Sequence, residues 1–193
     1  MLNRCVFLDR DGTINEEVNY LSRPDQLRLI AGAAEAIKRF EQAGLKVVIV
    51  TNQAGIARGY FSEPALQQIH LELEKMLRAQ DAHIDAIYYC PHHPTAGIGV
   101  YKIDCNCRKP KPGLLERAAR ELNLDLNRSF IVGDKPADLQ AGEAAGCRTI
   151  LVRTGYGLES EKELAGGNFT PDHIADDLLE ASRWIFQLPD FLA

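Results

Sequence analysis

Short apolar runs alternate along the chain with stretches of helical period, and this alternation limits the fold more than any other feature. One run, Val47-Val48-Ile49-Val50, is β-branched and apolar on both faces, as a buried parallel strand should be. Strand–helix alternation implies right-handed crossovers and a parallel sheet covered on both faces. We therefore predict an α/β, Rossmann-like three-layer sandwich, with strands at 5–8, 47–50, 86–89, 129–132 and 149–152.

The intervening segments predict helices. Ala34, Ile37 and Phe40 recur at helical spacing, and Ser62 is placed to cap a helix that carries Leu66, Ile69, Leu73 and Leu77. Further helices are expected from Pro112 to 122, over 137–145, and around 184–186. The 193 residues contain no evident linker, so we expect one domain over residues 1–193. An irregular stretch as long as 91–111 is unusual inside one domain unless it has a function or is fixed to the rest of the fold.

Charge and composition exclude several classes of protein. The net charge of −5 argues against a nucleic-acid or anionic-membrane binder, since both need a basic surface. No apolar run approaches the roughly 20 residues that span a bilayer, and the start of the chain does not resemble a signal peptide. We expect a cytoplasmic monomer that binds neither nucleic acid nor membrane.

Acidic residues follow two of the predicted strands. Asp9 and Asp11 follow the first strand, and Asp134 follows the fourth. Ligands bind at the carboxyl ends of parallel strands, where three carboxylates repel one another unless a cation lies among them. Hard oxygen ligands suit Mg²⁺, which typically bridges carboxylates and a substrate phosphate. Ordinary turn and cap residues are the alternative interpretation.

Other residues near these strand ends suit a phosphoryl group. Thr51 offers a hydroxyl and backbone N–H groups, Lys109 or Lys111 offers a positive charge, and helix N-termini offer free N–H donors.

Four segments, in order, resemble the motifs of the haloacid dehalogenase-like phosphatases. They are Asp9-Arg10-Asp11-Gly12-Thr13, Thr51 after its strand, Lys109, and Gly133-Asp134 with Asp138. The resemblance implies that Asp9 attacks phosphorus and that Asp11 is the acid and then the base. Asp11 can serve as an acid near neutral pH only if the charge of Asp9 and partial burial raise its pKa, so we expect a raised pKa. The resemblance further implies that Thr51 and Lys109 stabilise the phosphoryl charge. It also implies Mg²⁺ ligands from the Asp9 side chain, the Asp11 backbone carbonyl and Asp134, while Asp138 orients Lys109 or a metal-bound water.

Cysteine and histidine residues bracket the irregular stretch. Cys90, His92, Cys105 and Cys107 complete a tetrahedral set typical of structural Zn²⁺, with His93 as an alternative to His92. Such a site would pin the loop 90–107 and fix Arg108 and Lys109 at the phosphate pocket. Reduced cysteines that merely lie near one another are the alternative. His70 and His83 have no such neighbours and are expected to face solvent.

The spacing of the motifs leaves no room for a separate cap domain, so specificity must come from loops. The candidate substrate-binding residues are mostly polar or charged, which suits a sugar phosphate: Glu17, Val18, Asn19, Tyr20, Thr51, Asn52, Gln53, Ala54, Arg58, Arg108, Lys109 and Lys135. Arg58 alone also fits a surface charge.

Within the superfamily, the segments at 9–15, 51–59 and 90–110 together resemble a group of bacterial sugar-bisphosphate phosphatases. The resemblance implies that residues 17–20, 51–54, 108–109 and Lys135 contact substrate, and a second phosphate would give Arg108 and Lys135 a partner. A sister group that acts on histidinol phosphate has similar motifs. Glu16 and Glu17 leave that function as an alternative. A zinc-bearing binding module without activity is a third interpretation, which intact Asp9, Asp11 and Asp134 oppose.

Overall fold

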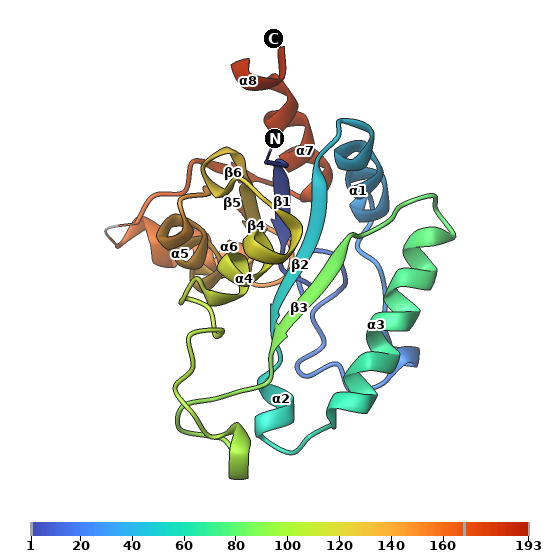
Figure 1. The fold of residues 1–193 in the computed structure, drawn as a ribbon, viewed down its shortest axis with the longest axis vertical. Coiled ribbons are helices and arrows are strands. Elements are labelled where there is room, and N and C mark those ends of the chain that lie inside the picture. Colours follow the sequence, from blue (N-terminus) through green and yellow to red (C-terminus); the bar gives the residue numbers. More distant parts are fainter. Residues whose placement is uncertain (1, 168, 193) are drawn as a thin grey trace.

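Parallel strands form the centre of the computed structural model, which describes residues 2–167 and 169–192 (Figure 1). Within them the sheet has six strands: β1 (Cys5–Leu8), β2 (Lys46–Asn52), β3 (Ala86–Cys90), β4 (Phe130–Gly133), β5 (Arg148–Val152) and β6 (His173–Ala175). Every pair is parallel. The predicted fold class and its five strands are confirmed, but β6 was missed because three residues are too few to show a pattern.

The order of the strands is β3-β2-β1-β4-β5-β6, so β1 lies inside the sheet between β2 and β4. Phe7 is in register with Val48 on one side and with Ile131 on the other. The chain moves outward from β1 in both directions, which makes the carboxyl ends of β1 and β4 the switch point where open α/β sheets bind ligands.

Helices cover both faces of the sheet (Figure 1). Val6 and Leu8 pack in the cluster that includes α1 (Ala33–Gln42), α3 (Glu63–Arg78) and α7 (Leu178–Gln187). Cys5 and Phe7 point the other way, into the cluster with α4 (Gly113–Leu122) and α5 (Pro136–Ala145). This alternation buries β1 completely and fixes the direction of the residues that follow it.

The predicted helices are present, and Ser62 caps α3 by accepting a hydrogen bond from Ala65 N at 3.3 Å. One further helix, α6 (Gly157–Ala165), was not predicted, and its Leu164 packs in a small cluster with Leu139 and Leu151. Short helical elements complete the described chain: α2 (Ala54–Ala57), α8 (Pro189–Leu192) and the 3-10 turns Pro24–Gln26, Gly99–Tyr101 and Leu126–Arg128. Among the described helices, none is both long enough and apolar enough to cross a membrane.

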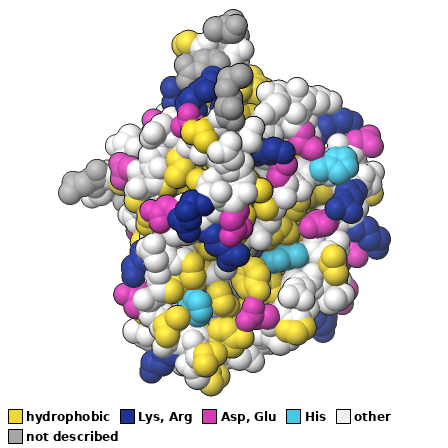
Figure 2. All heavy atoms as spheres, viewed as in Figure 1, with side chains coloured by type: hydrophobic (Ala, Val, Ile, Leu, Met, Phe, Trp, Pro, Cys, Tyr) yellow, Lys and Arg dark blue, Asp and Glu magenta, His cyan; other side chains and the backbone are white. Residues whose placement is uncertain are grey.

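The segment between β3 and α4 is irregular apart from the 3-10 turn Gly99–Tyr101, and it extends past the carboxyl ends of the strands (Figure 1). In Figure 2, hydrophobic side chains gather over this lower part of the molecule. Ile98 and Val100 are exposed there. The described segments between Thr13 and Thr51 and between Thr51 and Lys109 hold α1, α2, α3, β3 and this loop, and no cap domain.

Candidate active site

Three carboxylates meet at the carboxyl ends of β1 and β4. One oxygen each from Asp9, Asp134 and Asp138 lies within 4.8 Å of the others, and all three residues are buried. Asp134 Oδ2 accepts from Tyr156 N at 2.9 Å, whereas Asp134 Oδ1 is buried without a partner among the described residues. Burial and the neighbouring Asp9 raise the pKa of Asp134 to about 8. An unpaired carboxylate oxygen among hard oxygen donors fits a divalent cation such as Mg²⁺.

Gly12 lets the chain turn tightly against these acids. It has a φ of 84°, and a Cβ at this position would lie 2.2 Å from Asp134 Oδ2. A side chain would therefore push Asp134 out of the cluster, which explains why glycine follows Asp11.

Lys109 pairs with two of these three acids and is almost fully buried. Its Nζ lies 2.9 Å from Asp9 Oδ1, forms an ion pair with Asp138, and donates to Val50 O at 2.6 Å. Burial alone would lower the pKa of Lys109, but Asp138 and Asp9 outweigh it and hold that pKa above its ordinary value. Thr51 is buried nearby, and its Oγ1 accepts from Gln53 Nε2 at 2.9 Å. Lys111 lies apart, since its Nζ pairs with the exposed Asp104.

Asp11 differs from the sequence-based expectation. Its Oδ2 lies 2.7 Å from Arg10 Nη2, and its carboxylate also accepts from Asn15 Nδ2 and Gln53 Nε2 at 2.9 and 3.0 Å. Burial raises the pKa of Asp11, but Arg10, Asn15 and Gln53 more than offset that effect, and the pKa is lowered. The expectation of a raised pKa is wrong, because these donors stabilise the ionised form.

A cavity of about 430 Å³ opens beside the acids. Its lining includes Asp9, Asp11 and Asp138 together with ten of the twelve candidate substrate-binding residues: Glu17, Asn19, Tyr20, Thr51, Asn52, Gln53, Ala54, Arg108, Lys109 and Lys135. Val18 and Arg58 are not part of the lining; Val18 is exposed, and the Arg58 guanidinium lies 5.9 Å from the centre of the Tyr20 ring. Leu21, Gly55, Ala137 and Tyr156 complete the lining, and the sequence reasoning missed them.

Lys135 lies at the mouth of this cavity between three groups. Its Nζ is 3.0 Å from Glu17 Oε2, 3.9 Å from Asp134 Oδ2 and 4.7 Å from the centre of the Tyr156 ring. Burial opposes the charge of Lys135, yet Asp134, Asp9 and Glu17 hold its pKa above the ordinary value. A cation is therefore available at the mouth for an anionic part of a ligand.

The second polar cluster lies in the loop after β3. Cys90, His92, Cys105 and Cys107 bring one ligand atom each within 4.8 Å of the others. Cys90 Sγ is 3.4 Å from Cys105 Sγ, and His92 Nδ1 is 3.4 Å from Cys107 Sγ. These separations fit four ligands around one Zn²⁺, for which the metal–sulfur distance is about 2.3 Å. His93 turns away, since its Nδ1 accepts from Thr95 N and Ala96 N.

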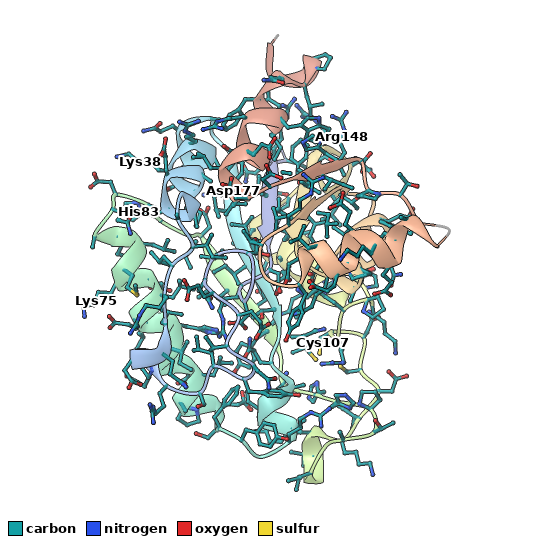
Figure 3. All side chains as sticks on the ribbon, turned by 180° about the vertical axis from the view of Figure 1, so that it is seen from behind. Lys38, Lys75, His83, Cys107, Arg148 and Asp177 are labelled. Carbon is teal, nitrogen blue, oxygen red and sulfur yellow. The ribbon has the colours of Figure 1, made fainter. Side chains whose placement is uncertain are left out.

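Asn52 joins the two clusters. Its Oδ1 accepts from Lys109 N at 3.1 Å, and its Nδ2 donates to Lys109 O at 3.0 Å. Lys109 follows Cys107 by two residues, and Figure 3 shows Cys107 toward the middle of the lower half of the molecule. Asn52, at the end of β2, therefore holds the backbone of Lys109, which follows the loop.

The position of His70 also differs from the sequence-based expectation. His70 was expected to face solvent, but it is only 8% exposed, and its Nε2 lies 3.2 Å from Arg10 Nη1. Burial and Arg10 lower the pKa of His70 to about 3. Its spacing from Leu66, Leu73 and Leu77 on α3 was the signal that could have placed it inward. His83 is exposed, as expected, and Figure 3 shows it at the outer edge of the molecule.

Comparison with known proteins gives concordant matches. The family model for HAD-hydrolase-like proteins matches residues 106–181. D-glycero-β-D-manno-heptose-1,7-bisphosphate 7-phosphatase of Haemophilus influenzae is 42% identical over 188 residues, which cover 97% of this chain and 99% of that protein. The protein of the same name from Pasteurella multocida is 46% identical over 177 residues, 91% of this chain and 95% of that one. The crystal structure of D,D-heptose 1,7-bisphosphate phosphatase from B. bronchiseptica, complexed with magnesium and phosphate, superimposes with a TM-score of 0.85 at 36% identity, covering 95% of this chain and 98% of that one.

Proposed function

Since the chain belongs to the haloacid dehalogenase-like hydrolases, in the group of the D-glycero-β-D-manno-heptose-1,7-bisphosphate 7-phosphatases, we propose that it removes the 7-phosphate of D-glycero-β-D-manno-heptose 1,7-bisphosphate. One observation carries the assignment of the chemistry to this site. Asp9 belongs to a cluster of three buried acids and pairs with Lys109, and both residues line a cavity that also presents Arg108 and Lys135. The products are heptose 1-phosphate and inorganic phosphate.

Asp9 is the nucleophile in this proposal. It lies directly after β1, and Lys109 holds its Oδ1 in place. Attack on phosphorus forms an aspartyl-phosphate and breaks the bond to the sugar oxygen, so one difficult displacement becomes two easier steps. Lys109 and Thr51 supply positive charge and hydrogen bonds for the transferring phosphoryl group.

Mg²⁺ would be held by the Asp9 side chain, the Asp11 backbone carbonyl and Asp134. When bound, it neutralises negative charge on the phosphoryl oxygens. The partnerless Oδ1 of Asp134 and the raised pKa of this residue support a cation at this position. Asp138 orients Lys109 through their ion pair.

Asp11 is the acid and base of this proposal. It starts the cycle protonated, gives that proton to the leaving sugar oxygen in the first step, and regains one from the water that hydrolyses the aspartyl-phosphate in the second. Its ion pair with Arg10 favours the carboxylate, which is the form that the second step uses.

Specificity for a bisphosphate comes from Arg108 and Lys135. Both line the cavity. Arg108 donates from Nη1 to His92 O at 3.2 Å, and Lys135 lies 3.9 Å from Asp134 Oδ2, so each brings a positive charge to the cavity that a second phosphate would bind. Glu17 now pairs with Lys135 and would be replaced by that phosphate. Gln53 and Asn52 are occupied with Asp11 and Lys109, so their part in substrate binding is indirect.

Zn²⁺ is the structural ion of this proposal, bound by Cys90, His92, Cys105 and Cys107. A closed set of four protein ligands leaves no open position for substrate, so the ion would hold the loop instead of taking part in the reaction.

The proposal also places the chain as one domain over residues 1–193, acting as a monomer in the cytoplasm, in bacterial heptose-nucleotide synthesis for surface glycans. Histidinol-phosphate hydrolysis and a silent zinc-bearing module are not favoured, because the named relatives are heptose phosphatases and the acids are in place.

The test compares phosphate release from the α and β anomers of heptose 1,7-bisphosphate, from histidinol phosphate and from fructose 1,6-bisphosphate, all with Mg²⁺. We expect the highest kcat/KM for the β-heptose bisphosphate and loss of turnover when Mg²⁺ is chelated. A higher kcat/KM for histidinol phosphate would contradict the proposal.

A further inference from the structure

A buried polar chain lies behind Asp11, outside the cluster that faces phosphorus. Arg10 is completely buried, and its Nε and Nη2 both donate to the Asp11 carboxylate, at 2.7–3.1 Å. The remaining amine, Nη1, lies 3.2 Å from His70 Nε2 on α3. Arg10 therefore connects His70 on α3 with the carboxylate of Asp11.

Chemistry fixes the direction of the contact between Arg10 and His70. A guanidinium only donates, so Nε2 of His70 accepts and the imidazole is neutral with its proton on Nδ1. Burial and Arg10 favour this neutral form. His70 occupies the apolar face of α3 beside Leu66 and Leu73, where a leucine would also fit the pattern. A polar ring at this buried position is explained by its contact with Arg10.

The ring of His70 is itself held in place. It makes an edge contact with Tyr89, with ring centres 5.9 Å apart. Tyr89 donates its hydroxyl to Glu63, which also accepts from Tyr101 at 2.7 Å. Glu63 lies in the first turn of α3, so the same helix carries both the ring and its support.

We propose that His70 is a positioning residue, which through Arg10 fixes the orientation of the Asp11 carboxylate for proton transfer. The proposal rests on the assignment of Asp11 as acid and base. His70 lies outside the cavity lining among the described residues, so it acts on Asp11 without touching substrate.

A comparison of two substrates distinguishes this positioning role from a purely structural one. The sugar oxygen must be protonated as it leaves, whereas nitrophenolate leaves from p-nitrophenyl phosphate without a proton. In His70→Leu we expect kcat on heptose bisphosphate to fall about tenfold, with KM unchanged, because a misplaced acid slows the first step. The first turnover of nitrophenolate should change less than about twofold, since that step needs no acid.

Two variants control the experiment. His70→Gln keeps an acceptor for Arg10 and should recover kcat to within about threefold of the unaltered protein. Leu73→Ala lies on the same face of α3 and lowers stability by opening a cavity, but should leave the ratio of the two rates unchanged. If His70→Leu does not yield folded protein, His70→Phe, which keeps a ring but has no acceptor, is compared in the same way.

A double-mutant cycle completes the test. In an Asp11→Asn background, replacing His70 should have no further effect on residual turnover, because the group that it positions is gone. Equal losses on both substrates, no loss on either, or a loss that persists in the Asp11→Asn background would overturn the proposal. If the heptose substrate fails with the unaltered protein, the proposed function fails, and the best alkyl phosphate against p-nitrophenyl phosphate still tests His70.

Discussion

The carboxylates at the strand ends and the Cys/His cluster of the loop after β3 lie at the same end of the sheet, but they are held there by different means. Asp9 and Asp134 follow strands that are hydrogen-bonded within the sheet, and β1 is paired on both sides. Cys105 and Cys107 lie in irregular chain, where few backbone hydrogen bonds, such as Ile98 N to Ala57 O at 2.8 Å, tie the loop to the body. Secondary structure therefore positions the acids, whereas in our proposal Zn²⁺ bound by the Cys/His cluster holds the loop.

Lys109 belongs to both regions. Its backbone is the continuation of the loop after Cys107, and its ammonium is buried among Asp9 and Asp138. Damage to the acids should remove chemistry and spare the fold, while damage to the loop should act on chemistry through Lys109. The predictions below test this contrast.

Replacement of the nucleophile should have the largest effect. Asp9→Asn is nearly isosteric but not nucleophilic, so we expect phosphate release to fall by at least about 10⁴-fold. Circular dichroism should show an unchanged fold. Radiolabelled phosphate that still became attached to the variant chain would refute the role of Asp9.

Replacement of the acid and base should have the next largest effect. Asp11→Asn cannot transfer the protons, and we expect kcat to fall by roughly 10²–10⁴-fold. Rapid-quench measurement with the sugar substrate should show slow formation of the aspartyl-phosphate. A variant that turned over at the unaltered rate would remove Asp11 from the mechanism.

Loss of the loop cluster should act on both stability and rate. Cys107→Ala removes one ligand, so we expect zinc content near zero, a lower Tm and a kcat reduced by at least about tenfold as Lys109 loses its fixed position. Cys147→Ala is the matched control, a buried thiol outside the cluster that should keep one zinc per chain by elemental analysis. A zinc-free, folded variant with full turnover would show that the loop keeps Lys109 in position without zinc.

Lys135→Ala tests the mouth of the cavity. Loss of a charged contact to the second phosphate should raise KM for the bisphosphate by about 10–100-fold. The KM for a monophosphate should change much less. Lys111→Ala serves as the control, since Lys111 pairs with Asp104 outside the cavity. Equal effects of the two substitutions would argue for a general loss of positive charge.

Loss of a surface ion pair should have the smallest effect. Lys75 is 76% exposed where it pairs with Glu72, and it lies on the outside of α3 (Figure 3). Lys75→Ala should change the free energy of unfolding by less than about 0.5 kcal/mol and leave turnover unchanged. A larger change in chemical denaturation would mean that α3 is more sensitive than its exposed face suggests.

The sequence was sufficient for the strands that carry the acids. Runs such as Val47–Val50 have one interpretation because both faces are buried, and the residues after them must then share an edge of the sheet. Such reasoning needs only periodicity and topology. It failed at β6, where His173–Ala175 is too short to show a period.

Side-chain partners were harder to predict than positions. The Arg10 contact with Asp11 depends on the turn at Gly12, and no spacing rule gives its direction. Tyr156 comes from the loop after β5 and reaches the cavity because its backbone N–H binds Asp134. His70 was misplaced because no metal-ligating residue lies near it in the sequence, whereas its partner in the structure is the guanidinium of Arg10, sixty residues away.

The place of β1 between β2 and β4 also sets the order in which this enzyme becomes active during its synthesis. Asp9 is made long before the strand that completes its surroundings, in which Ile131 lies beside Phe7. A ribosome adds about 5–20 residues per second, so Asp9 waits several seconds for its partners. A nascent chain therefore carries Asp9 long before the site around it can form.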